Sequence, residues 1–83
     1  MAVTLYNLAR IELNEGRLDE AKLLYDESLD ILKESGDSVG IANTLHELGM
    51  IEQQRGNYPE AKKLYDQSLG IRQKLRDQSG ATH

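Results

Sequence analysis

The side chains of this 83-residue sequence whose type and spacing could do chemistry are mainly carboxylates and serines that recur in pairs. Paired carboxylates can serve as a general acid and base, and a serine hydroxyl can be a nucleophile beside a histidine. Such pairs recur at one spacing of 40 residues, among them Glu12 and Glu52, Glu20 and Glu60, and Ser28 and Ser68. A spacing shared by unrelated side chains indicates a repeated sequence unit and does not indicate an active site.

The paired carboxylates have structural interpretations. Glu20 and Glu60 fall in the first turn of predicted helices, where negative charge interacts favourably with the helix dipole. Glu12 and Glu52 are interpreted as capping or solvated carboxylates. We therefore do not expect either pair to perform acid–base catalysis.

The remaining candidates for chemistry are also weak. Ser28 and Ser68 fill small-residue packing positions and have no histidine at a useful spacing. His46 and His83 are the only histidines, and the sequence has no cysteine to complete a metal site. The segment 36–40 is not a phosphate loop, because no Lys-Ser or Lys-Thr follows its glycine. We expect no enzyme activity, no cofactor and no bound metal.

An internal repeat organises the whole chain. Residues 4–43 align without a gap on residues 44–83, and 17 of the 40 aligned positions are identical. A period of this length predicts stacked supersecondary units that cannot bury their apolar faces alone. We predict a single repeat domain, residues 1–83, with repeat one at 1–40 and repeat two at 41–83.

Turn signals divide the chain into four predicted helices. Gly16 and Gly56 suit a left-handed helix end, Asp37 or Ser38 suits an N-cap, and Pro59 suits a first helical turn. The fold class expected is all-α: two tandem antiparallel helix-turn-helix repeats, a fragment of an α-solenoid. The expected helices are about 2–15, 18–35, 38–55 and 58–77. The tail 78–83 is expected to fray or to begin another repeat.

Apolar spacing defines the predicted core of each repeat. Leu5, Leu8 and Ala9 in the first helix correspond to Leu45, Leu48 and Gly49 in the third, at three- and four-residue steps. Small side chains allow neighbouring helices to approach closely. Gly49 therefore predicts a tight contact, because glycine within a helix costs about 1 kcal/mol relative to alanine. Tyr25 and Tyr65 are expected to pack against the next helix, with the hydroxyl group reaching a polar partner.

Composition excludes several classes. The net charge of −4 disfavours a nucleic-acid partner, which needs a surplus of basic residues. Apolar runs of two or three residues are too short to span a membrane. The absence of cysteine is compatible with a reducing compartment, so we expect a cytoplasmic location. The halves differ in charge: residues 1–40 carry four basic and nine acidic side chains, and residues 41–83 carry six and five.

The repeated residues resemble tetratricopeptide repeats. The matching positions are Leu5, Leu8, Ala9, Gly16, Leu18, Ala21, Tyr25 and Ser28, then Leu45, Leu48, Gly49, Gly56, Tyr58, Ala61, Tyr65 and Ser68. The period departs from the usual value of about 34 residues. Leucine replaces the family's frequent tryptophan at the start of the pattern, glutamate replaces a later tyrosine, and the closing proline is missing. The longer form is similar to bacterial regulatory and signalling repeat arrays and to the kinesin light chain.

The resemblance implies a scaffold that binds peptides or proteins on the concave face of the first helix of each repeat. The positions carried over are Val3, Tyr6, Arg10, Leu13 and Asn14 in repeat one, and Asn43, His46, Met50, Gln53 and Gln54 in repeat two. These positions differ between the repeats, which fits a ligand surface and also fits unconstrained solvent exposure. Arg10 could pair with a carboxylate of the partner, and Met50 or Leu13 could receive an apolar side chain.

Self-association is the alternative function. The last predicted helix has an apolar stripe that no further repeat in this sequence covers, and such stripes favour oligomerisation. Its candidate residues are Tyr65, Leu69, Arg72 and Leu75. Head-to-tail stacking or a twofold pairing could cover them. The chain could then be a homo-oligomeric module or an engineered repeat building block.

Overall fold

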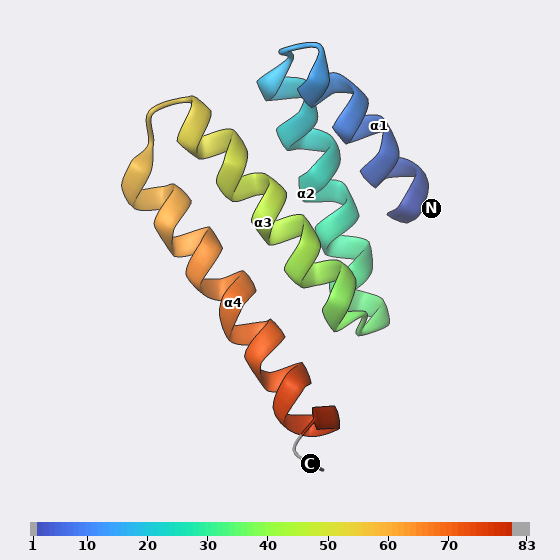
Figure 1. The fold of residues 1–83 in the computed structure, drawn as a ribbon. Coiled ribbons are helices and arrows are strands. Elements are labelled where there is room, and N and C mark those ends of the chain that lie inside the picture. Colours follow the sequence, from blue (N-terminus) through green and yellow to red (C-terminus); the bar gives the residue numbers. More distant parts are fainter. Residues whose placement is uncertain (1, 81–83) are drawn as a thin grey trace.

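The computed structural model describes the backbone of residues 2–80 and the side chains of residues 4–76. All regular structure within this range is helical (Figure 1). The helices are α1 (Ala2–Asn14), α2 (Leu18–Ser35), α3 (Ser38–Gln54) and α4 (Tyr58–Gly80). Each helix packs against the next in the sequence, so the chain forms two antiparallel hairpins joined between α2 and α3. This confirms the predicted all-α fold of two helical hairpins.

Three glycines end the helices or form the turns, as the sequence predicts. Gly16 and Gly56 adopt φ values of 82° and 86°, and Gly36 adopts 74°. This left-handed region is costly for residues with a Cβ atom, so glycine is favoured there. Asp37 then caps α3, because its Oδ1 atom accepts a hydrogen bond of 3.0 Å from the Gly40 amide.

Helix α4 is longer than the sequence indicated. It ends at Gly80 instead of near residue 77, and residues 81–83 lie outside the described part of the chain. The reason lies at position 76, where Arg76 replaces the glycine that ends α2 at Gly36. Without a residue suited to the left-handed conformation, the helix continues. In Figure 1, α4 accordingly extends past the ends of its neighbours. The division into repeats at residues 40 and 41 stays a prediction.

The hydrophobic core lies where the first hairpin meets α3. Its buried members are Ala9, Ala21, Tyr25, Leu48 and Ile51. Half-buried apolar side chains pack around them, namely Tyr6, Leu13, Leu18, Leu24, Leu29 and Leu64. Small residues sit at the close approaches, as predicted: Ala9, Ala21 and Ala61 are all buried. The core therefore joins the two repeats into one unit.

Leu8 departs from the predicted core. It is 45% exposed, whereas its counterpart Leu48 is 4% exposed. Ile11 is likewise 51% exposed, whereas Ile51 is fully buried. The physical reason is position in the stack: α2 packs against the face of α3 that carries Leu48 and Ile51, and no described helix packs against the same face of α1.

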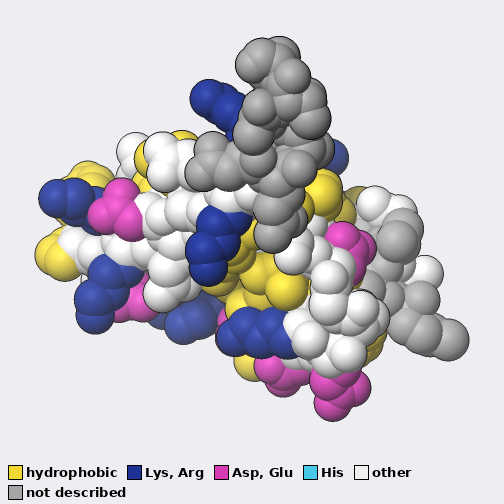
Figure 2. Space-filling model, turned by 90° about the horizontal axis from the view of Figure 1, so that it is seen from below, with side chains coloured by type: hydrophobic (Ala, Val, Ile, Leu, Met, Phe, Trp, Pro, Cys, Tyr) yellow, Lys and Arg dark blue, Asp and Glu magenta, His cyan; other side chains and the backbone are white. Residues whose placement is uncertain are grey.

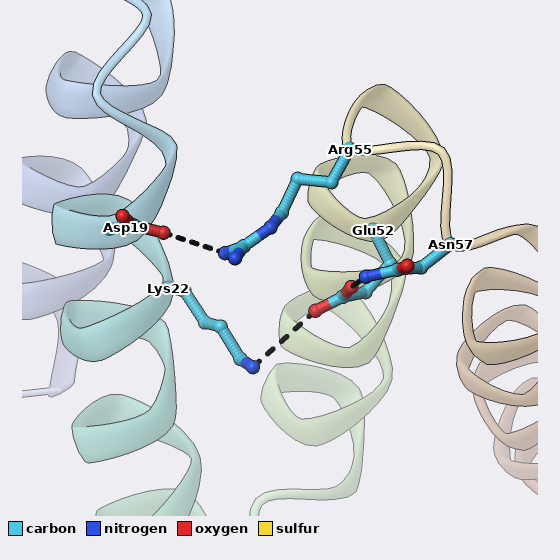
Figure 3. Close-up of polar contacts among 5 residues, drawn as sticks. All are labelled: Asp19, Lys22, Glu52, Arg55 and Asn57. Carbon is cyan, nitrogen blue, oxygen red and sulfur yellow. Dashed lines mark hydrogen bonds and ion pairs between the residues drawn. The ribbon is translucent and has the colours of Figure 1, made fainter.

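Polar contacts reinforce the joint between α2 and α3 (Figure 3). Arg55 Nη1 lies 2.7 Å from Asp19 Oδ1, and Lys22 Nζ lies 3.4 Å from Glu52 Oε2. The Asp19 side chain is strongly exposed, so its pair contributes little, whereas Glu52 is buried. Among the described residues, no helix is long and apolar enough to cross a membrane.

Candidate functional site

The first part of the predicted ligand face is an aromatic pair backed by a carboxylate. The rings of Tyr6 and Tyr25 meet edge to face, with centroids 5.4 Å apart. Both hydroxyl groups donate to Glu47 of α3, over 3.3 Å from Tyr6 and 3.4 Å from Tyr25. Burial and the negative charge of Glu47 raise the pKa of both tyrosines, so they stay protonated. Tyr6 therefore links α1 to α3.

The second part of the face lies against α4. The His46 ring packs on Tyr65 with centroids 5.2 Å apart, and the Tyr65 hydroxyl donates to Gln53 Oε1 over 2.8 Å. Arg72 Nη2 donates to Asn43 Oδ1 over 3.0 Å. The structure thus brings together residues that the sequence analysis had assigned to two different functions. His46, Gln53 and Asn43 were predicted to bind a partner, whereas Tyr65 and Arg72 were predicted to mediate self-association.

The other predicted residues differ in availability. Arg10, Asn14 and Gln54 are exposed, and Met50 is half-buried. Leu13 packs against the core cluster, so it is less free to receive a ligand side chain than the sequence indicated. The Val3 side chain lies outside the described residues. We call the surface formed by the predicted positions of α1 and α3 the A-face: Tyr6, Arg10, Leu13, Asn14, Asn43, His46, Met50, Gln53 and Gln54.

A hollow of about 350 Å³ lies between the A-face and α4. It is lined by His46, Tyr65, Ser68, Leu69 and Arg72. We call it the α4 hollow. Of the four predicted self-association residues, Leu69 and Arg72 are exposed and available for contact, and Tyr65 is half-buried. Leu75 is half-buried further along the same helix.

A larger cleft lies on the opposite side and was missed by sequence reasoning. It has a volume of about 690 Å³ and is lined by Lys22 and Lys33 of α2, Leu45 and Leu48 of α3, and Leu64 of α4, among others. We call it the B-side cleft. No A-face residue lines it. The cleft is the space that α2 and α4 leave between them on either side of α3, and no sequence motif indicates that space.

The B-side cleft continues towards the C-terminal end of α4. A second hollow of about 410 Å³ shares Lys33 and Leu45 with it and adds Ile41, Ile71 and Lys74. Figure 2 views the molecule from this end and shows hydrophobic side chains gathered in the middle, with Lys and Arg side chains beside them. Of the leucines that line the cleft, Leu45 and Leu48 are almost fully buried.

The repeated carboxylates stabilise turns. Asn57 Nδ2 donates to Glu52 Oε1 over 2.7 Å, and in repeat one Arg17 Nη1 contacts Glu12 Oε1 over 3.1 Å. The hydrogen bond from Asn57, together with Lys22, lowers the pKa of Glu52. Each carboxylate therefore stabilises the turn that follows its helix.

The other candidates for chemistry are also structural. Ser68 is buried and donates to the Ala42 carbonyl over 2.8 Å, which is the packing role predicted for it. Among the described residues, no three His, Asp or Glu side chains gather in a way that could hold a metal ion. His83 lies outside those residues.

The fold and surfaces define a helical-hairpin repeat scaffold, a class in which stacked hairpins present extended faces to other molecules. The family model for the tetratricopeptide repeat matches residues 1–74, and the chain belongs to that family. No curated protein and no solved structure matches the chain. Tetratricopeptide repeats as a family mediate protein–protein interaction and are typically not enzymes.

Proposed function

We propose that this chain is a protein-interaction module whose A-face binds an extended peptide or protein segment. One observation carries the proposal: a side chain of α1 reaches α3 across the boundary between the two repeats. The Tyr6 hydroxyl donates to Glu47 of α3 over 3.3 Å, so the predicted face of α1 lies next to α3 at this point. A peptide segment lying across both helices would contact the A-face residues of α1 and those of α3 together.

The chemistry of the A-face favours a particular kind of segment. The exposed guanidinium group of Arg10 can pair with a carboxylate, and His46 offers a ring nitrogen for hydrogen bonding. Met50 is half-buried and polarisable, which suits an apolar anchor side chain. We therefore expect a segment with an acidic residue and an apolar residue. Two repeats form a short surface, so the affinity is expected to be micromolar or weaker. A cytoplasmic location is part of this proposal.

Peptide selection followed by calorimetry tests the A-face. A displayed random-peptide library is selected against the chain, and each selected peptide is titrated against the parent and against the double variant Arg10→Ala/His46→Ala. Both side chains are exposed, so the fold should survive. We expect the double variant to lose at least about tenfold in affinity, because a charge-assisted hydrogen bond contributes roughly 1.5–3 kcal/mol.

The matched control removes two basic residues from the opposite side. Lys33→Ala/Lys74→Ala changes the B-side cleft and its continuation and leaves the A-face intact. Unchanged affinity in this control, with loss in the A-face variant, supports the proposal. The reverse pattern would place the ligand in the B-side cleft and overturn the A-face assignment.

Self-association is the second candidate function, and the exposed side chains at the two ends of the stack favour it. Leu69 of α4 is 55% exposed and Ile11 of α1 is 51% exposed. Apolar surface of this kind at both ends is available for contact with another molecule. Homo-oligomerisation would cover both ends in one step.

A further inference from the structure

The joint between α2 and α3 shows how one repeat of this chain docks on another. Tyr25 of α2 shares the core cluster with Leu48 and Ile51 of α3, and Leu29 packs against that cluster. The ion pair between Lys22 and Glu52 crosses the same joint (Figure 3). The joint therefore has two halves, one on the second helix of a repeat and one on the first helix of the next.

Helix α1 carries one half of this joint, and among the described residues no helix packs against that half. Leu8 and Ile11 stand 40 residues before Leu48 and Ile51 and have the same side chains. In α3 both are covered, whereas in α1 about half of each side chain is exposed. Thr4 is also exposed, whereas its counterpart in α3 is fully buried. The uncovered face of α1 is thus equivalent to the covered face of α3.

The last helix carries the other half. Tyr65 and Leu69 of α4 stand at the positions of Tyr25 and Leu29. Tyr25 is fully buried and Leu29 half-buried, whereas Tyr65 is half-buried and Leu69 mostly exposed. The α4 hollow is lined by Tyr65 and Leu69, so it lies on the side of α4 that corresponds to the side of α2 covered by α3.

We infer that a second copy of this chain docks head-to-tail, with its α1 against α4 in the register in which α3 packs against α2. Leu8 and Ile11 of one copy then cover Tyr65 and Leu69 of the other. This inference rests on the self-association candidate, and the docking site shares His46 with the A-face, because His46 lines the α4 hollow. Its occupant is the chain itself, because the chain already contains both halves of the joint and joins them once internally.

The polar residues fit this register in part. Lys62 and Glu12 are the counterparts of Lys22 and Glu52, so the same ion pair can form between copies. Asn7 stands where Glu47 faces Tyr25, so an amide oxygen replaces the carboxylate. The pair formed by Asp19 and Arg55 is not reproduced, because Pro59 and Glu15 stand at those positions.

Charge favours the head-to-tail arrangement over a twofold one. It brings the basic α4 of one copy towards the acidic first repeat of the next, since residues 1–40 carry nine acidic and four basic side chains; α1 itself carries one of each, so the attraction acts at long range. A twofold pairing of α4 faces would bring the basic side chains of two α4 helices together and would leave Leu8 and Ile11 exposed. Head-to-tail docking does not close, so the assembly should grow with concentration. One helix-to-helix joint is small, so association should be weak.

Sedimentation velocity from micromolar to millimolar concentration tests the inference. The parent chain is expected to increase in average mass with concentration. Leu69→Glu and Ile11→Glu each place a charge on one half of the joint at an exposed site, and each alone should abolish the growth. Leu23→Glu is the matched control: Leu23 is 61% exposed on α2, and a charged residue, Lys63, stands at its counterpart.

Mixing the two variants gives the sharpest result. The Leu69→Glu copy retains an intact α1 face, and the Ile11→Glu copy retains an intact α4 face. The mixture should therefore form dimers and nothing larger. Circular dichroism checks that each variant keeps the helical content of the parent.

Two outcomes would overturn the inference. A parent chain that stays monomeric at millimolar concentration leaves both faces to a different partner. Loss of association in Leu69→Glu, with Ile11→Glu behaving like the control, would indicate twofold pairing through α4. Neither outcome affects the calorimetric test of the A-face, so the two proposals fail separately.

Discussion

Gly49 of α3 lies directly beneath the ring of Tyr65 of α4. A Cβ atom built at Gly49 would approach Tyr65 Cε1 to 2.8 Å and Cδ1 to 2.9 Å. Such contacts are closer than real Cβ atoms make. The Tyr65 ring therefore occupies the space that the Cβ atom of any residue other than glycine would need at position 49. The tight approach predicted for this helical glycine is confirmed, and it explains why the His46 and Gln53 side chains can reach Tyr65.

Alanine substitutions at two helical glycines should separate this contact from helix propensity. Gly70→Ala should raise the free energy of unfolding by roughly 0.5–1 kcal/mol, because alanine is the better helix former and a Cβ there meets no atom within 4 Å. Gly49→Ala gains the same propensity but displaces the Tyr65 ring, so its net effect should be smaller or destabilising. Urea unfolding of both variants gives the comparison. An equal or larger gain at Gly49 would contradict the contact.

Glu52 should give the chain part of its acid sensitivity. The hydrogen bond from Asn57 and the charge of Lys22 lower the pKa of this carboxyl group in the folded state. A lowered pKa means that the stabilisation is complete above the pKa of an unfolded glutamate and is lost as pH falls through the folded value. Glu52→Gln should therefore cost about 1–2 kcal/mol at neutral pH and should flatten the loss of stability below about pH 4.5.

Chemical unfolding at a series of pH values measures this effect. Glu27→Gln is a suitable control, because Glu27 is exposed on α2. If Glu52→Gln lost as much stability at low pH as the parent chain does, the contacts among Lys22, Glu52 and Asn57 would not be the source of that loss.

Tyr25 and Tyr65 stand at equivalent positions of the two repeats, but they should contribute different amounts to the free energy of unfolding. Tyr25→Ala removes a fully buried ring from the centre of the core and should cost about 3–5 kcal/mol. That is much of the total for a chain of this size, so the variant should be largely unfolded. Tyr65→Ala removes a half-buried ring and should cost roughly half as much. Thermal unfolding followed by circular dichroism measures both, and equal losses would contradict the asymmetry.

The buried tyrosines should make the fold sensitive to alkali. Burial, with Glu47 adding to it, raises the pKa of Tyr6, Tyr25 and Tyr65. A raised pKa means that the stabilisation is complete below the pKa of an unfolded tyrosine, about 10, and is lost as pH rises above it. Stability should therefore fall from about pH 10 upwards. Tyr25→Phe should reduce that fall, whereas Tyr58→Phe, at an exposed ring, should not.

Much of the fold was predictable because its signals are local. Gly16 and Gly56 mark turns through their own backbone preferences, and Asp37 caps a helix through an amide three residues away. Local signals also explain why α4 ends at Gly80, later than the expected end near residue 77. Asp77 repeats the N-cap residue Asp37, but Arg76 replaces the glycine that ends α2, and the helix continues.

The candidate site was predictable only in part. The pattern placed Tyr6 and His46 at corresponding positions, and both pack on the tyrosine of their own hairpin. The sequence pattern could not show that Gln53 accepts a hydrogen bond from Tyr65, because that contact depends on the packing of α3 against α4. Leu13 is half-buried and packs against the core cluster, and its role as a ligand anchor stays a prediction. The B-side cleft had no sequence signal, because it is a space between elements.

The amino-acid sequence alone determined the repeat, the helical hairpins, the turns and the residue positions that pack between helices. These follow from periodicity and backbone preference, which act over a few residues. Tertiary structure decided which copy of each repeated residue is covered. Leu8 and Leu48 have the same side chain at the same position of their repeats, yet only Leu48 is buried, because burial depends on whether a neighbouring helix lies across that face.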